Sequence, residues 1–262
     1  MSTAAVMLVK DELDVLPWTL RHLEYHVDAI YVADNGSTDG TREMLEDVAL
    51  AIPVEVIDDF EVGHFQSRKT TALAMRALTE GHSWVVPVDA DEVWYVAADP
   101  ERRIADYLAG QGPDVMIVEA ELYHHLPSRT DTPAQLEPNP YRRIVWRNRE
   151  RGVLPKVACR LRPDLTILDG NHGAATTGTA LRVGGLCIRH FSWRTREQYL
   201  RKIRNGAAAF AATDLPADTG AHWRVWDDAL DEAIMEHLDT WFYASHPERD
   251  DALILDPAPA KA

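Results

Sequence analysis

The stretch AIYVADNGSTDGT, residues 29–41, and the stretch WVVPVDADE, residues 84–92, determine the fold that this sequence predicts. In each of them, an apolar run of strand length is followed at once by carboxylates and turn-forming residues. Such runs alternate with helical patterns through the first half of the chain, which predicts a largely parallel α/β sheet. Ligands bind outside the carboxyl ends of the strands in such sheets, so Asp34, Asp89 and Asp91 are candidates for a single site.

The other elements follow from the same periodicities. Residues 123–151 contain four prolines mixed with His, Asn and Arg, which predicts a long loop region of the kind that forms acceptor sites or lids. Strands are expected at residues 4–9, 29–33, 54–57, 84–88, 115–118, 156–168 and 182–188. Helices are expected at residues 13–27, 42–49, 67–80, 195–212 and 222–243.

The length of the chain favours one catalytic domain with appended segments, because 262 residues bury one large core. We expect a catalytic domain at residues 1–212, with a nucleotide-binding half at about 1–95 and an acceptor half at about 96–212. A helical segment is expected at 213–249. Residues 250–262 include DPAPAKA and have little apolar content, which predicts a disordered tail.

Charge and cysteine content narrow the partners and the compartment. The chain has 27 basic and 42 acidic side chains and a formal charge of -15, so its average field repels nucleic acids and anionic membranes. Its cysteines, Cys159 and Cys187, are not spaced as a metal-ligand pair or a disulfide framework, and no apolar run is long enough to span a membrane. These features predict a soluble, cytoplasmic protein with no nucleic-acid partner and no transmembrane segment.

The segment DADE, residues 89–92, carries the strongest chemical signal. Asp89 and Asp91, with Glu92 adjacent, concentrate negative charge where a strand ends, and carboxylates so close to one another repel. Mg²⁺ or Mn²⁺, bound by one or two carboxylates and by substrate phosphates, would remove that repulsion. A solvated acidic turn is the alternative. The segment DNGSTDGT is weaker evidence, because its residue types also favour turns and helix caps.

Over residues 4–95, the two segments together resemble the nucleotide-sugar half of family 2 glycosyltransferases of the GT-A fold. The resemblance implies a GT-A type, Rossmann-like, mostly parallel sheet flanked by helices, with C-terminal helices. It also implies that Asp91, the second Asp of a DxD-type motif, binds the metal ion. By the same resemblance, Asp89 lies on the ribose side of the nucleotide and Asp34 contacts the base.

Further nucleotide contacts are implied elsewhere in this half. Lys10 and Glu12, in the early VKDE segment, would lie under the nucleotide. Arg68, in GHFQSRKTT, stands where this family often supplies an arginine toward the nucleotide, and a planar cation there suits a diphosphate or a base. The same stretch is close to a phosphate loop, but Arg68 occupies the place of the second glycine, which the close backbone approach requires.

The later segments LPKVACRLRPDLTILDGNHGA and IRHFSWRTREQYLRKI resemble the C-terminal half of the same group more weakly. They imply that His190 completes the metal shell and that Lys156 and Arg194 are partners of the diphosphate. The group that takes the proton of the acceptor hydroxyl is open, because no clear Glu-Asp pair follows the DxD-type motif. Its candidates, in the order in which we rank them, are Asp169, His172 and Glu121.

The leading prediction is a metal-dependent glycosyltransferase that moves a sugar from a nucleoside diphosphate sugar to a hydroxyl acceptor, with inversion. One alternative is a haloacid dehalogenase-type phosphatase with Asp89 as nucleophile, although that nucleophile normally ends the first strand and three strand-like segments precede Asp89. Another is a non-catalytic nucleotide-binding module that acts through the tryptophan-rich helix at 222–243. Its apolar residues recur at helical spacing, which is typical of a core or of the seam of a homodimer.

Overall fold

The computed structural model describes the chain except for residues 179, 217–218, 227, 242–249 and 258–262. The chain forms two compact units. Unit 1 comprises Met1–Asp59, Gln66–Tyr123 and Arg151–His190, and unit 2 comprises Phe60–Phe65, His124–Glu150 and Phe191–Ala262. The predicted segments 1–212, 213–249 and 250–262 do not coincide with these units, because the chain leaves unit 1 and returns to it twice.

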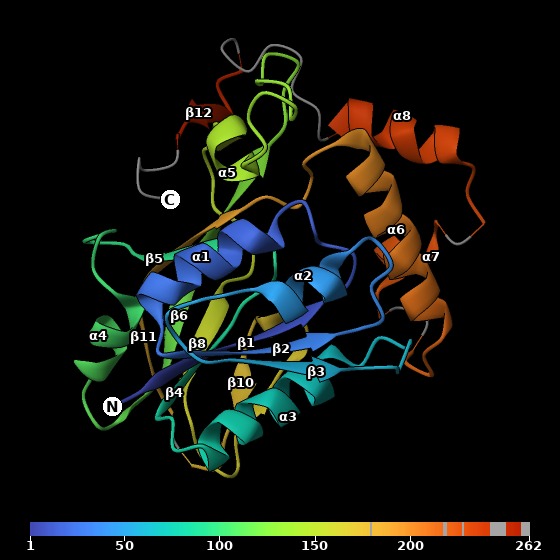
Figure 1. Ribbon diagram of the computed structural model, residues 1–262. Coiled ribbons are helices and arrows are strands. Elements are labelled where there is room, and N and C mark those ends of the chain that lie inside the picture. Colours follow the sequence, from blue (N-terminus) through green and yellow to red (C-terminus); the bar gives the residue numbers. More distant parts are fainter. Residues whose placement is uncertain (179, 217–218, 227, 242–249, 258–262) are drawn as a thin grey trace. The chain divides into compact units, whose positions relative to one another are not determined.

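Unit 1 is built on a sheet with a parallel centre (Figure 1). β1 lies between β2 and β4, and β2 also pairs with β3, all in parallel. On the far side of β4, β8 and then β6 extend the sheet with antiparallel pairs. The strands are β1 (Thr3–Val9), β2 (Ala29–Asp34), β3 (Val54–Asp58), β4 (Trp84–Pro87), β6 (Val115–Leu126) and β8 (Lys156–Arg160).

The order β6-β8-β4-β1-β2-β3 places a topological switch point between β1 and β4. The chain first adds β2 and β3 on one side of β1 and then crosses back to add β4 on the other. The crossovers contain α1 (Leu16–His26), α2 (Thr41–Asp47) and α3 (Gln66–Thr79). Figure 1 shows α1 and α2 on one face of this sheet and α3 on the other.

Side chains of β1 point alternately to the two faces of the sheet, so each face packs against its own layer of helices. Ala4 and Val6 point to one face, where they form a buried cluster with Leu73 of α3. α1 buries Leu16, Leu20 and Leu23, which fall on one side of a helix. The architecture is therefore the predicted one, a Rossmann-like sheet with a parallel centre, flanked by helices, with C-terminal helices.

Two further strands of unit 1, β5 and β11, frame the acidic segment. β5 (Glu92–Val96), which is not among the expected strands, begins at the last residue of the DADE segment and pairs antiparallel with β11 (Leu181–His190). This pairing sets His190 opposite Glu92. The remaining elements of the unit are short: α4 (Ile104–Ala109), β9 (Thr166–Ile167), the 3-10 turn η1 (Asp169–Asn171) and β10 (Ala174–Ala175).

Unit 2 contains the C-terminal helices. α6 (Arg196–Ala211) packs against α8 (Asp231–Trp241) through Tyr199, Ile203, Ile234 and Leu238. The single helix expected at 222–243 is instead divided into α7 (Ala221–Arg224) and α8, and residues 242–243 lie outside the described part of the chain. The guanidinium of Arg204 donates to the carbonyls of Trp226 and Ala229, which a continuous helix would use internally.

The regions expected to be a loop and a tail also contain regular structure. α5 (Pro140–Arg143) and β7 (Trp146–Asn148) lie within the expected loop at 123–151, and β6 continues into it as far as Leu126. β12 (Leu253–Leu255) pairs antiparallel with β7, so this part of the expected disordered tail is a strand, stabilised by backbone pairing that composition does not reveal. Residues 258–262 are not among those described. In the chain as described, no helix combines the length and the apolarity needed to cross a bilayer.

Candidate active site

The carboxyl ends of β1, β2 and β4 bring the predicted acidic segments to one edge of the unit 1 sheet. Val9, the last residue of β1, is in register with Asp34, the last residue of β2. On the other side of β1, the N–H of Val88 donates to the carbonyl of Val6 at 3.0 Å, so Asp89 and Asp91 follow at the same edge. This edge is the switch point between β1 and β4, where open α/β sheets bind their ligands.

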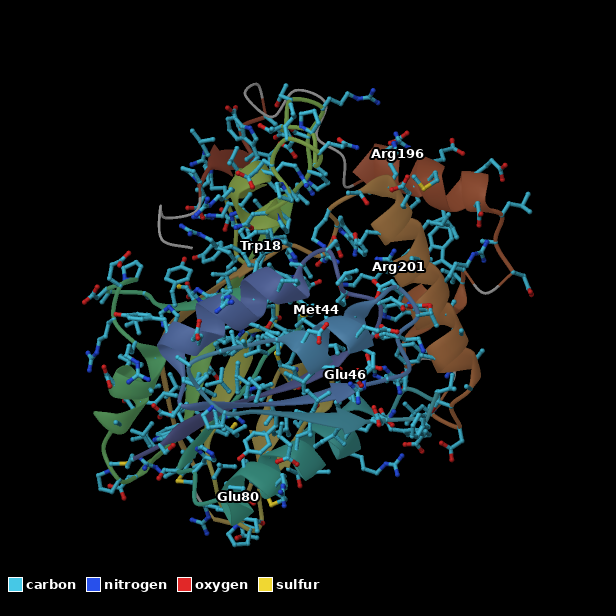
Figure 2. All side chains as sticks on the ribbon, viewed as in Figure 1. Trp18, Met44, Glu46, Glu80, Arg196 and Arg201 are labelled. Atoms are coloured by element: carbon cyan, nitrogen blue, oxygen red, sulfur yellow. The ribbon has the colours of Figure 1, made fainter. Side chains whose placement is uncertain are left out.

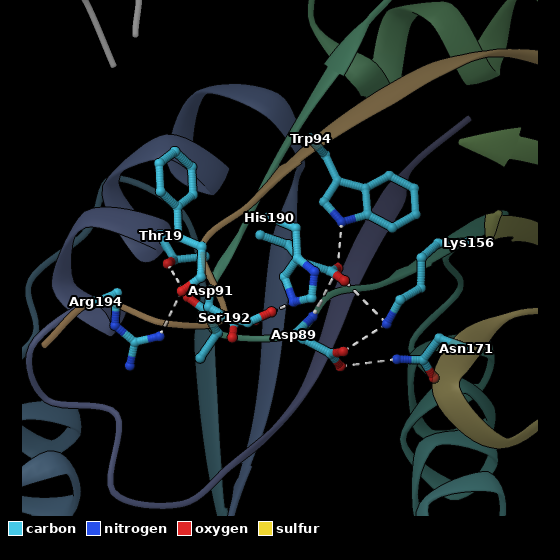
Figure 3. Close-up of polar contacts among 12 residues, drawn as sticks. Thr19, Asp89, Asp91, Trp94, Lys156, Asn171, His190, Ser192 and Arg194 are labelled. Atoms are coloured by element: carbon cyan, nitrogen blue, oxygen red, sulfur yellow. Dashed lines mark hydrogen bonds and ion pairs between the residues drawn. The ribbon is translucent and has the colours of Figure 1, made fainter. Parts of the chain in front are cut away.

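Asp89 is held by a buried lysine (Figure 3). Lys156 Nζ lies 2.6 Å from Asp89 Oδ2 and 3.0 Å from Glu92 Oε1. On the other side, Asn171 Nδ2 donates to Asp89 Oδ1 at 3.1 Å. Burial opposes the charge of Lys156, but the two carboxylates outweigh it and raise the lysine pKa, while burial raises the pKa of Glu92. Lys156 therefore compensates two of the three carboxylates whose repulsion the sequence predicts.

The third carboxylate, Asp91, lies beside His190. Asp91 is 2% exposed, and His190 Nε2 is 3.5 Å from its Oδ1 (Figure 3). The structure thus brings together the two residues predicted as metal ligands. A carboxylate oxygen and an imidazole nitrogen fit Mn²⁺ better than Mg²⁺, which prefers oxygen ligands. No group of three or more His, Cys, Asp or Glu among the described residues is arranged to hold a metal ion, so phosphate oxygens and water would complete the shell.

Asp34 presents an unsatisfied acceptor at the same edge. Its side chain is buried, and Oδ2 accepts the N–H of Ser37 at 3.1 Å. Oδ1 is buried without a hydrogen-bond partner among the residues that the structure describes. An unpaired buried carboxylate oxygen is costly, so a ligand that donates an N–H or O–H there would be stabilised.

The VKDE segment is tied to the turn that follows Asp34. Lys10 Nζ donates to the carbonyl of Asn35 at 2.9 Å, and the N–H of Glu12 donates to Thr41 Oγ1 at 3.0 Å. Asp11, between them, is a residue that the motifs do not single out. It has a φ of 54°, and its Oδ1 accepts the N–H of Thr38 at 2.6 Å. An Asp in a turn tolerates this left-handed backbone, but no sequence signal shows that it would.

The three candidates for the base have different partners. Asp169 is exposed, and its Oδ1 accepts the N–H of Ser67 at 2.9 Å, which caps the first turn of α3. Glu121 accepts the hydroxyl of Tyr123 at 3.0 Å and lies 3.3 Å from Arg151.

His172 Nδ1 lies 2.9 Å from the carbonyl of Pro155, which can only accept, so Nδ1 carries the proton and Nε2 is the acceptor of the neutral ring. Burial lowers the pKa of His172, which keeps the ring neutral at pH 7.

The backbone that carries His172 is unusual. Gly170 and Asn171 both have left-handed backbones, with φ of 69° and 57°. A Cβ on Gly170 would lie 2.3 Å from His172 Cδ2 and 2.8 Å from its Nε2, so the ring occupies space that only glycine leaves. Sparsely populated backbone conformations of this kind gather at functional sites. In this loop, Asn171 contacts Asp89, and His172 is the next residue along the chain.

The two arginines predicted to meet the nucleotide are in different units. Arg68 is exposed on the first turn of α3 in unit 1. Arg194 belongs to unit 2, where its N–H donates to Gln198 Oε1 and its guanidinium to the carbonyl of Phe191, both at 3.0 Å. Figure 2 shows Arg196 and Arg201 on α6 of the same unit, and Arg196 forms an ion pair with Asp239 of α8.

No protein-family model and no curated protein sequence matches the chain. Similar solved structures include S. aureus TarS 1-349 in complex with UDP, with a TM-score of 0.42 and 13% identity over 85% of this chain and 68% of that one. The same protein in complex with UDP-GlcNAc has a TM-score of 0.42 and 12% identity over 94% and 74%. HddC from Yersinia pseudotuberculosis has a TM-score of 0.41 and 10% identity over 77% and 97%. With similarities this low, function has to be argued from the residues of the site.

Proposed function

We propose that the chain is a metal-dependent glycosyltransferase that moves a sugar from a nucleoside diphosphate sugar to a hydroxyl acceptor. The observation that supports this most strongly is the gathering of Asp34, Asp89 and Asp91 at the switch point of the sheet, with His190 beside Asp91. A nucleoside diphosphate sugar offers three matching features: a base, a ribose and a diphosphate that binds metal ions.

Each part of the donor would bind a different one of these side chains. Asp34 accepts a hydrogen bond from the base at its unsatisfied Oδ1. Asp89 has lone pairs left for the ribose hydroxyls, because a carboxylate offers about four acceptor positions and Lys156 and Asn171 occupy two. Asp91 and His190 hold the metal ion, which, when bound, offsets the negative charge that develops on the leaving diphosphate.

Most of the remaining predicted contacts keep their roles within this proposal. Lys10 and Glu12 lie at the same sheet edge as Asp34 through their bonds to the following turn, and they line the floor under the nucleotide. Arg68, exposed on the first turn of α3, is the guanidinium group that we assign to the diphosphate, since a planar fork of donors suits phosphate oxygens. Arg194 is buried in unit 2, where its guanidinium donates to the carbonyl of Phe191, and we assign it no contact with the donor.

His172 is the base that the geometry supports best. Its Nε2 has a lone pair in the neutral ring, whereas Asp169 caps α3 and Glu121 faces Arg151. Removal of the acceptor proton by Nε2 leaves an oxygen that attacks the anomeric carbon directly, as the bond to the diphosphate breaks. Attack from the face opposite the leaving group inverts the configuration of that carbon.

The test is release of the nucleoside diphosphate from UDP-, GDP- and dTDP-sugars in the presence of Mn²⁺. We expect turnover of at least one donor by the unmodified protein, and loss of metal-dependent turnover in Asp91→Asn. Asp114→Asn, which alters an exposed aspartate of the same unit, is the matched control and should be fully active. Equal turnover by Asp91→Asn and the unmodified protein contradicts the proposal.

A phosphatase that uses Asp89 as nucleophile has less support. Both oxygens of Asp89 already accept hydrogen bonds, and β1, β2 and β3 precede the strand that carries it. Hydrolysis of p-nitrophenyl phosphate that disappears in Asp89→Asn would favour that reading.

A non-catalytic module that acts through the C-terminal helices would bind the donor without turnover. The ring of Trp223 packs closely on α6, where a Cβ on Gly206 would lie 2.4 Å from it. Trp223 therefore belongs to the core of unit 2, and the expected homodimer seam would need other residues of that segment.

A further inference from the structure

We infer that Lys156 is a positioning residue, which holds Asp89 for the hydroxyl groups of the donor's ribose and does not bind the diphosphate. The inference rests on the proposed function and replaces the role of diphosphate partner that the resemblance implied for Lys156. Its basis is the buried arrangement of Lys156, Asp89, Glu92 and Asn171.

Accessibility decides which member of the ion pair can meet a ligand. The Lys156 side chain is 4% exposed, whereas that of Asp89 is 33% exposed. A diphosphate needs an ammonium group that it can approach, and the ammonium of Lys156 is directed at two carboxylates. Solvent, and therefore a ligand, reaches the carboxylate of Asp89 instead.

Glu92 fixes the lysine independently of any ligand. It is fully buried, and its Oε2 accepts the indole N–H of Trp94 at 2.9 Å and the backbone N–H of Asp89 at 3.2 Å. The backbone N–H of Glu92 in turn donates to the carbonyl of Asp89 at 3.1 Å, which closes the turn. Lys156 thus joins the side chain of Asp89 to a residue that already holds its backbone.

The carboxylate of Asp89 is fixed from both sides. Lys156, at the start of β8, holds Oδ2, and Asn171, in η1, holds Oδ1. With two donors from separate elements, the plane of the carboxylate is set and its free lone pairs have fixed directions. An acceptor that is ordered before binding loses less conformational entropy when it meets a pair of hydroxyl groups.

Stability is a weak explanation for this arrangement. Buried ion pairs are often no more stabilising than well-packed apolar side chains, because both charges lose their hydration. Retaining Lys156 between two carboxylates is therefore better explained by what it orders. In this arrangement, Asp89 binds the ribose of the nucleoside, and Asp91 and His190 bind the diphosphate through the metal ion.

The experiment compares ligands with and without phosphates. Dissociation constants are measured without metal for uridine and UDP and for guanosine and GDP, using the pair that the unmodified protein binds. In Lys156→Met we expect the affinities for the nucleoside and for its diphosphate to fall by the same factor, on the order of tenfold or more. Lys202→Met, in unit 2, is the control and should leave both unchanged.

A second variant covers the case in which Lys156→Met does not fold, since it leaves two carboxylates without their cation. In Asp89→Asn, one of those charges is already absent. We expect Asp89→Asn and Asp89→Asn/Lys156→Met to bind the nucleoside equally, because a residue that acts through Asp89 has no effect once Asp89 is neutral.

The outcomes separate the inference from the proposed function. If Lys156→Met weakens only the binding of the diphosphate, Lys156 is a phosphate ligand. If it lowers the affinity for the nucleoside further in the Asp89→Asn background, Lys156 acts independently of Asp89. Either result makes the inference wrong, while the proposed function stands. If the unmodified protein binds neither ribonucleoside pair, the inference is wrong, and the proposed function fails with it only if no donor is turned over.

Discussion

His190 Nε2 lies 3.5 Å from Asp91 Oδ1, and the antiparallel pairing of β11 with β5 is what brings these two residues together. The ladder sets His190 opposite Glu92, so the imidazole reaches the residue just before that strand. The pairing of β5 with β11 therefore fixes His190 beside the turn that carries Asp91. The geometry leads to a direct expectation for metal binding.

His190→Asn should weaken Mn²⁺ binding by roughly 10–100-fold or more, because loss even of a residue that only supports a metal ligand has effects of that size. The measurement is a titration of free Mn²⁺ by electron paramagnetic resonance, with UDP present at saturation. His82→Asn is the control, since His82 pairs with Ser2 Oγ instead. If both variants bind Mn²⁺ as the unmodified protein does, His190 is not a ligand.

His172→Asn should lower kcat by roughly 10²–10⁴, the usual contribution of a general base, with little change in donor affinity. Asp169→Ala should instead cost about 1 kcal/mol of unfolding free energy, because it removes the acceptor that caps α3, with kcat nearly unchanged. Steady-state kinetics and thermal unfolding of both variants give the comparison. The reverse pattern, with kcat lost only in Asp169→Ala, would return the role of base to Asp169.

Gly170→Ala should destabilise the protein more than Gly36→Ala does. Both glycines have a φ of 69°, so the backbone cost of a side chain, roughly 1–2 kcal/mol, is common to the two. Only at Gly170 would the new Cβ meet the ring of His172, whereas nothing lies within 4 Å of a Cβ on Gly36. Chemical denaturation of the two variants measures the difference. Equal losses would mean that the ring moves away at no cost.

Stability should fall as the pH decreases from about 6.5 toward 4, because of two histidines of α1. Burial, the main cause, lowers the pKa of His22 to about 4 and that of His26 to about 3. Below the unfolded value of 6.5, the unfolded chain takes up protons that the folded chain does not. Each histidine thus removes about 1.4 kcal/mol per pH unit until its own folded pKa is reached.

Urea unfolding at several pH values measures this slope. His22→Gln and His26→Gln should each reduce it, and a slope unchanged in both variants would contradict the assignment. His237→Gln, which alters a histidine of unit 2, is the control.

The sequence predicts the centre of the sheet and the edge at which the carboxylates meet, because strands 1 to 4 follow simple apolar runs with turn residues after them. β5 is not among the expected strands, although residues 93–96 form a β-branched and aromatic run that favours a strand. Partners of single side chains are beyond the sequence. Lys156 and Asp89 are separated by 67 positions, and the contact between Asp169 and Ser67 depends on how η1 meets α3.

The most direct test of the central claim is a calorimetric titration with UDP, GDP and dTDP, each with and without Mn²⁺, of the unmodified protein and of Asp91→Asn. The account predicts that one of the nucleotides binds, that Mn²⁺ strengthens its binding, and that Asp91→Asn removes the effect of the metal while the protein remains folded. Absence of binding by all three nucleotides, or an effect of Mn²⁺ that is the same in Asp91→Asn, would contradict it.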